Sequence, residues 1–127
     1  MIIFVIDDGN VLEVYDSEAE LNGACEGIDA EDGVCRFFDQ TGQPLEPEFY
    51  KPNKRGKTLF GLINWVESGK YRLVRSRKSG QVNLIEALAA VVAIEKNSYF
   101  STLEDVRGSL TTGSSATANF AAPQPGR

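Results

Sequence analysis

The sequence contains no histidine, so it lacks the side chain that most often serves as a general base near neutral pH. The Ser-His-Asp and Cys-His catalytic arrangements and the zinc-protease helix are excluded with it. Cysteine is also scarce. A zinc site would need Cys25, Cys35 and two carboxylates, and these two cysteines do not form a Cys-x-x-Cys pair. The sequence therefore predicts neither a metal nor any other cofactor.

Two other common ligand motifs fail at particular positions. The segment "DAEDGV" places Gly33 one residue too early for a calcium loop, and Asp39 stands where that loop requires glutamate. The segment "KRGKT" ends like a phosphate-binding loop, but the first glycine of that motif would have to stand at position 51, which is lysine. We interpret neither segment as a binding site.

Long apolar runs are missing, since none approaches the roughly 18 residues that cross a bilayer. The first residues, "MIIFVIDDGN", also lack the basic region and cleavage site of a signal peptide. We therefore expect a cytoplasmic protein whose two cysteines are free thiols, with a disulfide as the minority alternative.

The 127 residues suit one domain, and 42% hydrophobic and 24% charged residues are ordinary globular values. Charge is distributed unevenly around the net value of −5. Residues 1–40 hold eleven acids against Arg36, residues 41–80 hold nine bases against three acids, and residues 81–127 are nearly neutral. This pattern indicates either two faces that attract each other within the fold or a charged surface for an oppositely charged partner.

Hydrophobic periodicity and turn residues predict most of the secondary structure. A hairpin is expected from "IIFVI" through "DDGN" to "VLEVYD", then a short helix capped by Ser17 and Glu20, and a strand over 33–39. Pro44 and Pro47 favour an extended edge segment and argue against a central strand. Residues 51–57 read as a basic loop, and strands follow at 58–66 and 70–76, the first of them central and covered on both sides.

The last part of the chain changes to helical periodicity. One helix is expected from Asn83 through Val92, with Asn83 and Glu86 as its cap, and a second from Ser101. The fold class predicted is α+β: an antiparallel sheet of about five strands, with a short N-terminal helix and two C-terminal helices on one face. We expect a globular domain over 1–110 and a flexible tail over 111–127, where periodicity is lost.

Carboxylates and thiols crowd the segment "ACEGIDAEDGVCRFFDQTG" (24–42). Paired carboxylates can act as a glycosidase-like acid and base, but in a small domain they are far more often solvated loop charges. Cys25 has no evident base to activate it and is expected to be a small buried thiol. Nucleic-acid binding through the basic middle segment is disfavoured by the acidic character of the whole chain. We therefore predict a protein that is not an enzyme.

Three segments together resemble immunity proteins, which are small bacterial proteins that neutralise polymorphic toxins. They are "CEGIDAEDGVCRFFDQTGQPL", "SGKYRL" and "EKNSYFSTLEDVRGSL", and the resemblance spans residues 1–110. It implies a non-catalytic protein that binds a cognate toxin domain and blocks its active site. A toxin that acts on nucleic acid would present a basic cleft, which a dense set of carboxylates can occupy.

The candidate contact surface is accordingly acidic, with aromatic anchors at its edge. Its members are Tyr15, Asp16, Glu18, Glu20, Asp29, Glu31, Asp32 and Phe38. A toxin of another activity could instead meet the basic middle segment. Two alternatives stay open: a general interaction or scaffold protein whose charged halves pair in a homodimer, and a small enzyme that uses carboxylates alone.

Overall fold

A computed structural model describes residues 1–58, 60–61 and 63–119. Its strands are β1 (Ile3–Ile6), β2 (Val11–Tyr15), β3 (Arg36–Phe38), β4 (Pro44–Lys51), β5 (Lys54–Thr58), β6 (Ile63–Glu67), β7 (Lys70–Arg75) and β8 (Ala93–Ile94). Its helices are α1 (Glu18–Ala24), α2 (Gly27–Glu31), α3 (Leu84–Ala87), the 3-10 turn η1 (Leu88–Ala90) and α4 (Leu103–Asn119).

Six strands form one mixed sheet in the order β7-β4-β3-β1-β2-β8. All neighbours are antiparallel except β2 and β8, which run parallel, and β5 and β6 form a separate two-stranded sheet. The α+β class is confirmed. The prediction of about five strands in a purely antiparallel sheet is wrong, because β4 (Pro44–Lys51), which the prolines argued against, and the two-residue β8 (Ala93–Ile94) both join the sheet, β8 in parallel.

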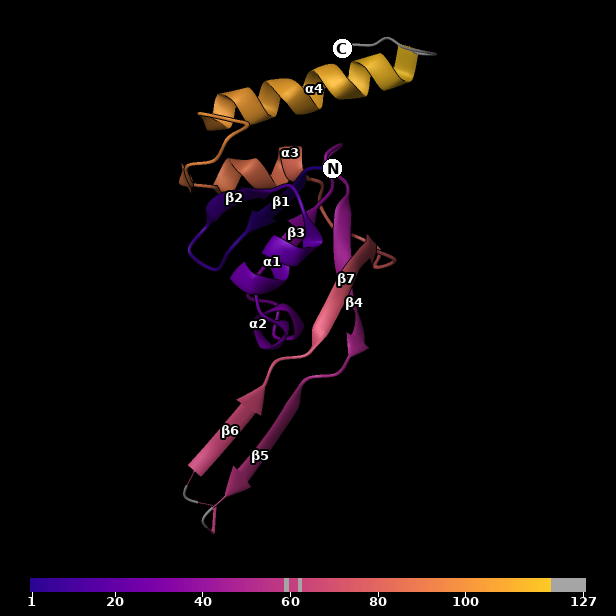
Figure 1. Ribbon diagram of the computed structural model, residues 1–127. Coiled ribbons are helices and arrows are strands. Elements are labelled where there is room, and N and C mark those ends of the chain that lie inside the picture. Colours follow the sequence, from indigo (N-terminus) through magenta and orange to yellow (C-terminus); the bar gives the residue numbers. More distant parts are fainter. Residues whose placement is uncertain (59, 62, 120–127) are drawn as a thin grey trace.

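Helices cover both faces of the sheet, and each face has its own core (Figure 1). Strand β1 divides its side chains between them: Phe4 and Ile6 pack under α3 and α4, while Ile3 and Val5 pack under α1 and α2. The C-terminal helices α3 and α4 share one face, but the whole arrangement of helices differs from the prediction. The second face is covered by α1 together with α2, a short helix that the sequence did not predict.

The first two strands form the predicted hairpin. Asp7 Oδ1 accepts hydrogen bonds from the backbone N–H groups of Gly9 and Val11 at 2.9 and 3.1 Å. Asn10 takes the left-handed conformation at φ 60°, which asparagine tolerates well in such turns. The following helix begins as expected, because the Ser17 hydroxyl accepts a hydrogen bond from the Glu20 N–H.

The helix predicted from Asn83 begins at the right place but ends early. Asn83 and Glu86 form the expected capping box. The helical backbone stops at Ala90, and Val92 donates its N–H to the Asn10 carbonyl oxygen at 2.9 Å. The extended chain then pairs with the free edge of β2 as strand β8. Pairing with that edge therefore prevails over the helical periodicity of the apolar residues.

The prediction that prolines keep residues 44–47 out of a central strand is wrong, since β4 lies between β3 and β7. Pro44 is the first residue of β4. Its carbonyl oxygen accepts a hydrogen bond from the Ser76 N–H, on the β7 side. Because backbone groups alternate along a strand, those of Pro47 point to the opposite edge, where β3 pairs only with Pro44 and Leu45. The missing N–H of Pro47 therefore interrupts no ladder bond.

The predicted central strand over 58–66 and the basic loop over 51–57 are also corrected. Residues 54–58 form strand β5, which pairs with β6, and the turn lies near Phe60 and Gly61 rather than at "ESGK". Leu59 and Leu62 lie outside the described residues. In β6, Trp65 and Val66 are exposed, so no second layer covers this strand.

The last helix contributes Val106 and Leu110 to the core below α3. It continues to Asn119, past the domain boundary that we predicted at residue 110, and residues 120–127 lie outside the described residues. None of the helices in the described part of the chain combines the length and apolar character that crossing a bilayer requires.

Candidate interaction site: the arm and the acidic face

Strands β5 and β6 continue the β4–β7 ribbon away from the six-stranded sheet, as Figure 1 shows. We call residues 51–70 the arm. Phe60 is fully exposed, and Trp65 and Val66 are 42% and 61% exposed. None of the three belongs to either core. A two-stranded ribbon is only marginally stable in water by itself, so the arm holds large apolar side chains where the fold gains little from them.

The register of the arm gives its two sides different chemistry. On one side Trp65 lies opposite Gly56, and a Cβ at Gly56 would overlap the indole ring. The ring therefore lies flat across the glycine. On the other side Arg55 lies opposite Val66 and Lys57 lies opposite Asn64. One side thus presents an aromatic surface, and the other presents cations.

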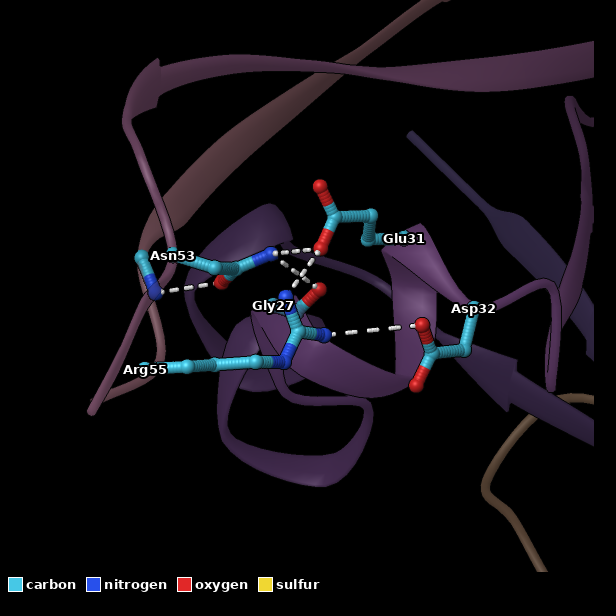
Figure 2. Close-up of polar contacts among 6 residues, drawn as sticks. Gly27, Glu31, Asp32, Asn53 and Arg55 are labelled. Carbon is cyan, nitrogen blue, oxygen red and sulfur yellow. Dashed lines mark hydrogen bonds and ion pairs between the residues drawn. The ribbon is translucent and has the colours of Figure 1, made fainter. Parts of the chain in front are cut away.

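Asn53 fixes the direction of the arm where it leaves the body (Figure 2). Its Nδ2 donates to the Gly27 carbonyl oxygen at 3.0 Å and to Glu31 Oε1 at 3.2 Å. Its Oδ1 accepts from the Gly69 N–H at 2.7 Å. A Cβ on Gly27 would approach Asn53 Oδ1 to 2.5 Å, so Gly27, Asn53 and Gly69 can pack together only because residue 27 has no side chain.

Arg55 adds a second link between the arm and helix α2 (Figure 2). Its guanidinium contacts Glu31 Oε1 at 3.2 Å and Asp32 Oδ1 at 3.5 Å. All three side chains are about half exposed, with values of 48–55%. Such a pair contributes at most about 1 kcal/mol to stability, so its main effect is to orient the ribbon.

The arm is strongly basic. It carries five bases against Glu67, a balance of +4. Lys51 and Lys70 lie directly opposite each other at its base. Like charges in that position destabilise a strand pair, and an anionic partner would relieve the repulsion. Among the described residues, Arg55 alone of these five bases forms an ion pair within 4.0 Å.

Several of the predicted contact residues already have contacts within the molecule. Glu31 and Asp32 are already bound by Arg55. Glu18 accepts a hydrogen bond from the Leu73 N–H at 3.3 Å. Phe38 is 2% exposed and lies in the core below α3 and α4, so the prediction that it anchors a partner at the surface is wrong. Strand alternation places its side chain inward.

Four carboxylates on or beside α1 and α2 remain exposed and take part in none of the ion pairs among the described residues. We call them the acidic face: Asp16, Glu20, Glu26 and Asp29. Over residues 13–32 the chain has eight acids and no base. Three members of this face, Asp16, Glu20 and Asp29, were predicted as contact residues.

Tyrosines border the acidic face on the side of strand β2. Tyr15 is half-buried and donates its hydroxyl to Glu13 Oε1 at 2.6 Å, and Tyr99 donates to Asp16 Oδ2 at 2.6 Å. Burial raises the pKa of Glu13, and the nearby Glu95 raises it further, although the hydrogen bond from Tyr15 opposes this. The hydrogen bond to Asp16 raises the pKa of Tyr99. Negative charge is therefore concentrated on this side of the molecule.

A hollow of about 670 Å³ lies between β4, Gly33 and residues 78–82. Two carboxylates line it, and both already accept hydrogen bonds. Glu31 accepts from Asn53 and Arg55, and Glu46 accepts from the Ser76 hydroxyl and the Arg77 N–H. In the described part of the chain no three acidic or sulfur side chains lie close enough together to hold a metal ion.

The two cysteines belong to the core below α1 and α2. Cys25 is buried, Cys35 is partly buried, and both are free thiols, as predicted. A hydrogen bond between the two thiols raises the pKa of Cys35, and burial adds to the shift. Tyr71 donates its hydroxyl to the Cys25 carbonyl oxygen at 2.6 Å. These contacts are consistent with a packing role for both thiols.

Comparison of the chain with protein-family models, with curated proteins and with solved structures found no match. The function is therefore inferred from the chain's own residues.

The arm was missed in the sequence because its apolar residues alternate as they would in a buried strand. Two signals pointed to it. Pro52 and Gly69 interrupt the flanking strands at matching positions, and Gly56 lies in the middle of a strongly basic segment. From the sequence alone, neither signal distinguishes an exposed two-stranded ribbon from an irregular loop, because the pairing of β5 with β6 is not known at that point.

Proposed function

We propose that this chain is a non-catalytic protein-binding module that docks on its partner through the arm. The observation that carries the proposal is the exposure of Phe60, Trp65 and Val66, none of which belongs to either core. Tryptophan dominates the energetics of many protein interfaces, and apolar patches of this kind mark interaction sites. Phe60 also adopts φ 57°, which costs a non-glycine residue of this size about 1 kcal/mol or more.

The same geometry and the resemblance described above support an immunity function as part of this proposal. A narrow ribbon suits insertion into the active-site cleft of a toxin domain, and its cations favour a cleft lined by acids. The acidic face offers a second contact surface, which suits a nuclease or another toxin with a basic cleft. Both surfaces belong to a protein that acts by occupying a site rather than by catalysis.

The test is capture of a partner from the organism that encodes the chain, with three baits compared. They are the wild type, an arm variant with Trp65→Thr and Val66→Thr, and the control Val92→Thr. Val92 is 73% exposed on the body, so its substitution removes an exposed methyl group outside the arm. Threonine keeps the β-propensity of the arm. We expect the wild type and the control to recover one partner and the arm variant to bind it at least about 30-fold more weakly.

Equal recovery by the arm variant would show that the arm is not the docking surface. A second step tests immunity: the purified partner is assayed for its own activity with and without an equimolar amount of this protein. Inhibition supports the immunity function, whereas binding without inhibition leaves a scaffold or interaction protein. The acidic face is tested by reversing Asp16, Glu20 and Asp29, because reversal of Glu31 and Asp32 would also break the contacts of Arg55.

A further inference from the structure

The exposed side chains of the arm define what kind of surface could bind it. It exposes apolar side chains, carries a balance of +4, and begins with two lysines that face each other. An occupant that stabilises it must cover apolar surface and bring negative charge to Lys57 and to the Lys51–Lys70 pair.

The chain itself carries the complementary surface. Residues 13–32 hold eight acids and no base, and the acidic face has four carboxylates outside the ion pairs of the described residues. Within one molecule, Arg55 with Glu31 and Asp32 is the contact that joins these two charged regions by an ion pair. That contact is a model for how the two regions bind each other: carboxylates at the end of α2 form ion pairs with a cation of the arm. Most of both charges is left for another molecule.

We propose that the occupant of the arm is the acidic face of a second copy of this chain. Two copies would pair around a two-fold axis, so that each arm lies on the other's α1 and α2 and the same contact forms twice. Val66, which lies on the same side of the ribbon as Arg55 and Lys57, becomes covered in the same step. This inference goes beyond the proposed function and does not depend on it: a partner protein would compete with the second copy for the same arm, so partner binding would require the dimer to open.

A second copy fits the charges better than a nucleic acid does. The acidic face lies on helices next to the base of the arm, since α2 contacts Asn53 and Arg55 directly. A phosphate backbone held by the arm would meet these carboxylates and a net charge of −5. In the dimer, the arm of each copy is neutralised by the acidic face of the other copy, and its acidic face is neutralised by the other copy's arm.

Sedimentation velocity of the full chain tests the proposal. We expect a dimer at about 50 mM NaCl whose dissociation constant rises at least about tenfold at 500 mM, because exposed charges are screened at that ionic strength. An arm variant with Lys57→Glu and Lys70→Glu should be monomeric. Its fold should persist, since Lys57 is exposed and Lys70→Glu replaces a like-charge pair with an attractive one.

Charge exchange gives the decisive measurement. A face variant with Glu20→Lys and Asp29→Lys should also be monomeric, and a mixture of the arm variant with the face variant should form a heterodimer. In that heterodimer one contact joins a wild-type arm to a wild-type face, and the other joins the introduced glutamates to the introduced lysines. In each variant alone, the introduced charges meet charges of their own sign in both contacts. The matched control is Lys78→Glu, an exposed lysine outside the arm, which should leave the dimer intact.

Three results would overturn the proposal: a monomer at low salt, a dimer that both variants retain, or variants that stay apart when mixed. A monomer that binds a labelled 20-nucleotide DNA or RNA through Lys57 would assign the arm to nucleic acid instead. None of these results changes the outcome of the capture experiment, because the binding of a partner protein to the arm can also be measured when this protein is a monomer. Circular dichroism of each variant separates loss of association from loss of the fold.

Discussion

Replacing Asn53 with alanine is expected to loosen the arm from the body. The substitution removes the hydrogen bonds to the Gly27 carbonyl oxygen (3.0 Å) and from the Gly69 N–H (2.7 Å), together with the longer one to Glu31 (3.2 Å). Gly27 and Gly69 are both buried, so their backbone groups lose a partner that water replaces poorly. At about 1 kcal/mol for each of these two bonds, and little for the exposed bond to Glu31, Asn53→Ala should lower the free energy of unfolding by about 2 kcal/mol.

Denaturation in guanidinium chloride, followed by far-ultraviolet circular dichroism, measures this loss, and amide hydrogen exchange locates it at Gly69. Asn64→Ala is the matched control, because Asn64 is exposed on β6 and the substitution is chemically the same. It should change stability by less than about 0.5 kcal/mol. If Asn53→Ala were as stable as this control and the Gly69 amide stayed protected from hydrogen exchange, the conclusion that Asn53 holds the arm to the body would be refuted.

Three further outcomes are expected. Gly23→Ala in α1 should stabilise the protein by about 0.5–1 kcal/mol in a thermal melt, because a Cβ there meets nothing within 4 Å. Gly69→Ala should destabilise it by more than about 2 kcal/mol, because its Cβ would overlap the Lys51 carbonyl oxygen; unchanged stability would contradict the close packing there. Glu13→Gln keeps an acceptor for Tyr15 and removes a carboxyl whose pKa is raised by burial, so it should stabilise the fold at pH 7. In the wild type, the protonated Glu13 carboxyl favours the folded state below the pKa that this carboxyl has in the unfolded chain. That contribution is lost as the pH rises through the pKa of Glu13 in the folded protein. The denaturation curves of wild type and variant should therefore converge near pH 4.

Local signals in the sequence were sufficient for the elements that depend on neighbouring residues. The hairpin turn at Asp7 and Asn10, the cap at Ser17 and the capping box at Asn83 are all present, since each depends on side chains within four residues. The α+β class followed from the change of period near Asn83. These features are fixed by the chain's local chemistry.

Elements that depend on distant partners were predicted wrongly. Val91 and Val92 have helical spacing, yet the free edge of β2 holds this segment extended. Pro47 lies in an interior strand because β3 is too short to need its N–H. The same holds for the candidate site residue Glu31: whether it is free or held by Arg55 depends on the path of a ribbon that begins twenty residues later. A single sequence shows charges, whereas the fold decides which of them are already neutralised.

The register at the base of the arm has a consequence for how this molecule can be rebuilt. Lys51 and Lys70 are cross-strand neighbours, and β4 and β7 pair from there back to Leu45 and Arg75. The eighteen residues between them therefore enter and leave the body at adjacent points, and of the side chains that the structure describes there, neither core includes any. A two-residue Asn-Gly turn has the geometry to close that gap. The body can thus serve as a scaffold that carries ribbons of different sequence and length at one fixed position, much as an antibody domain carries its variable loops.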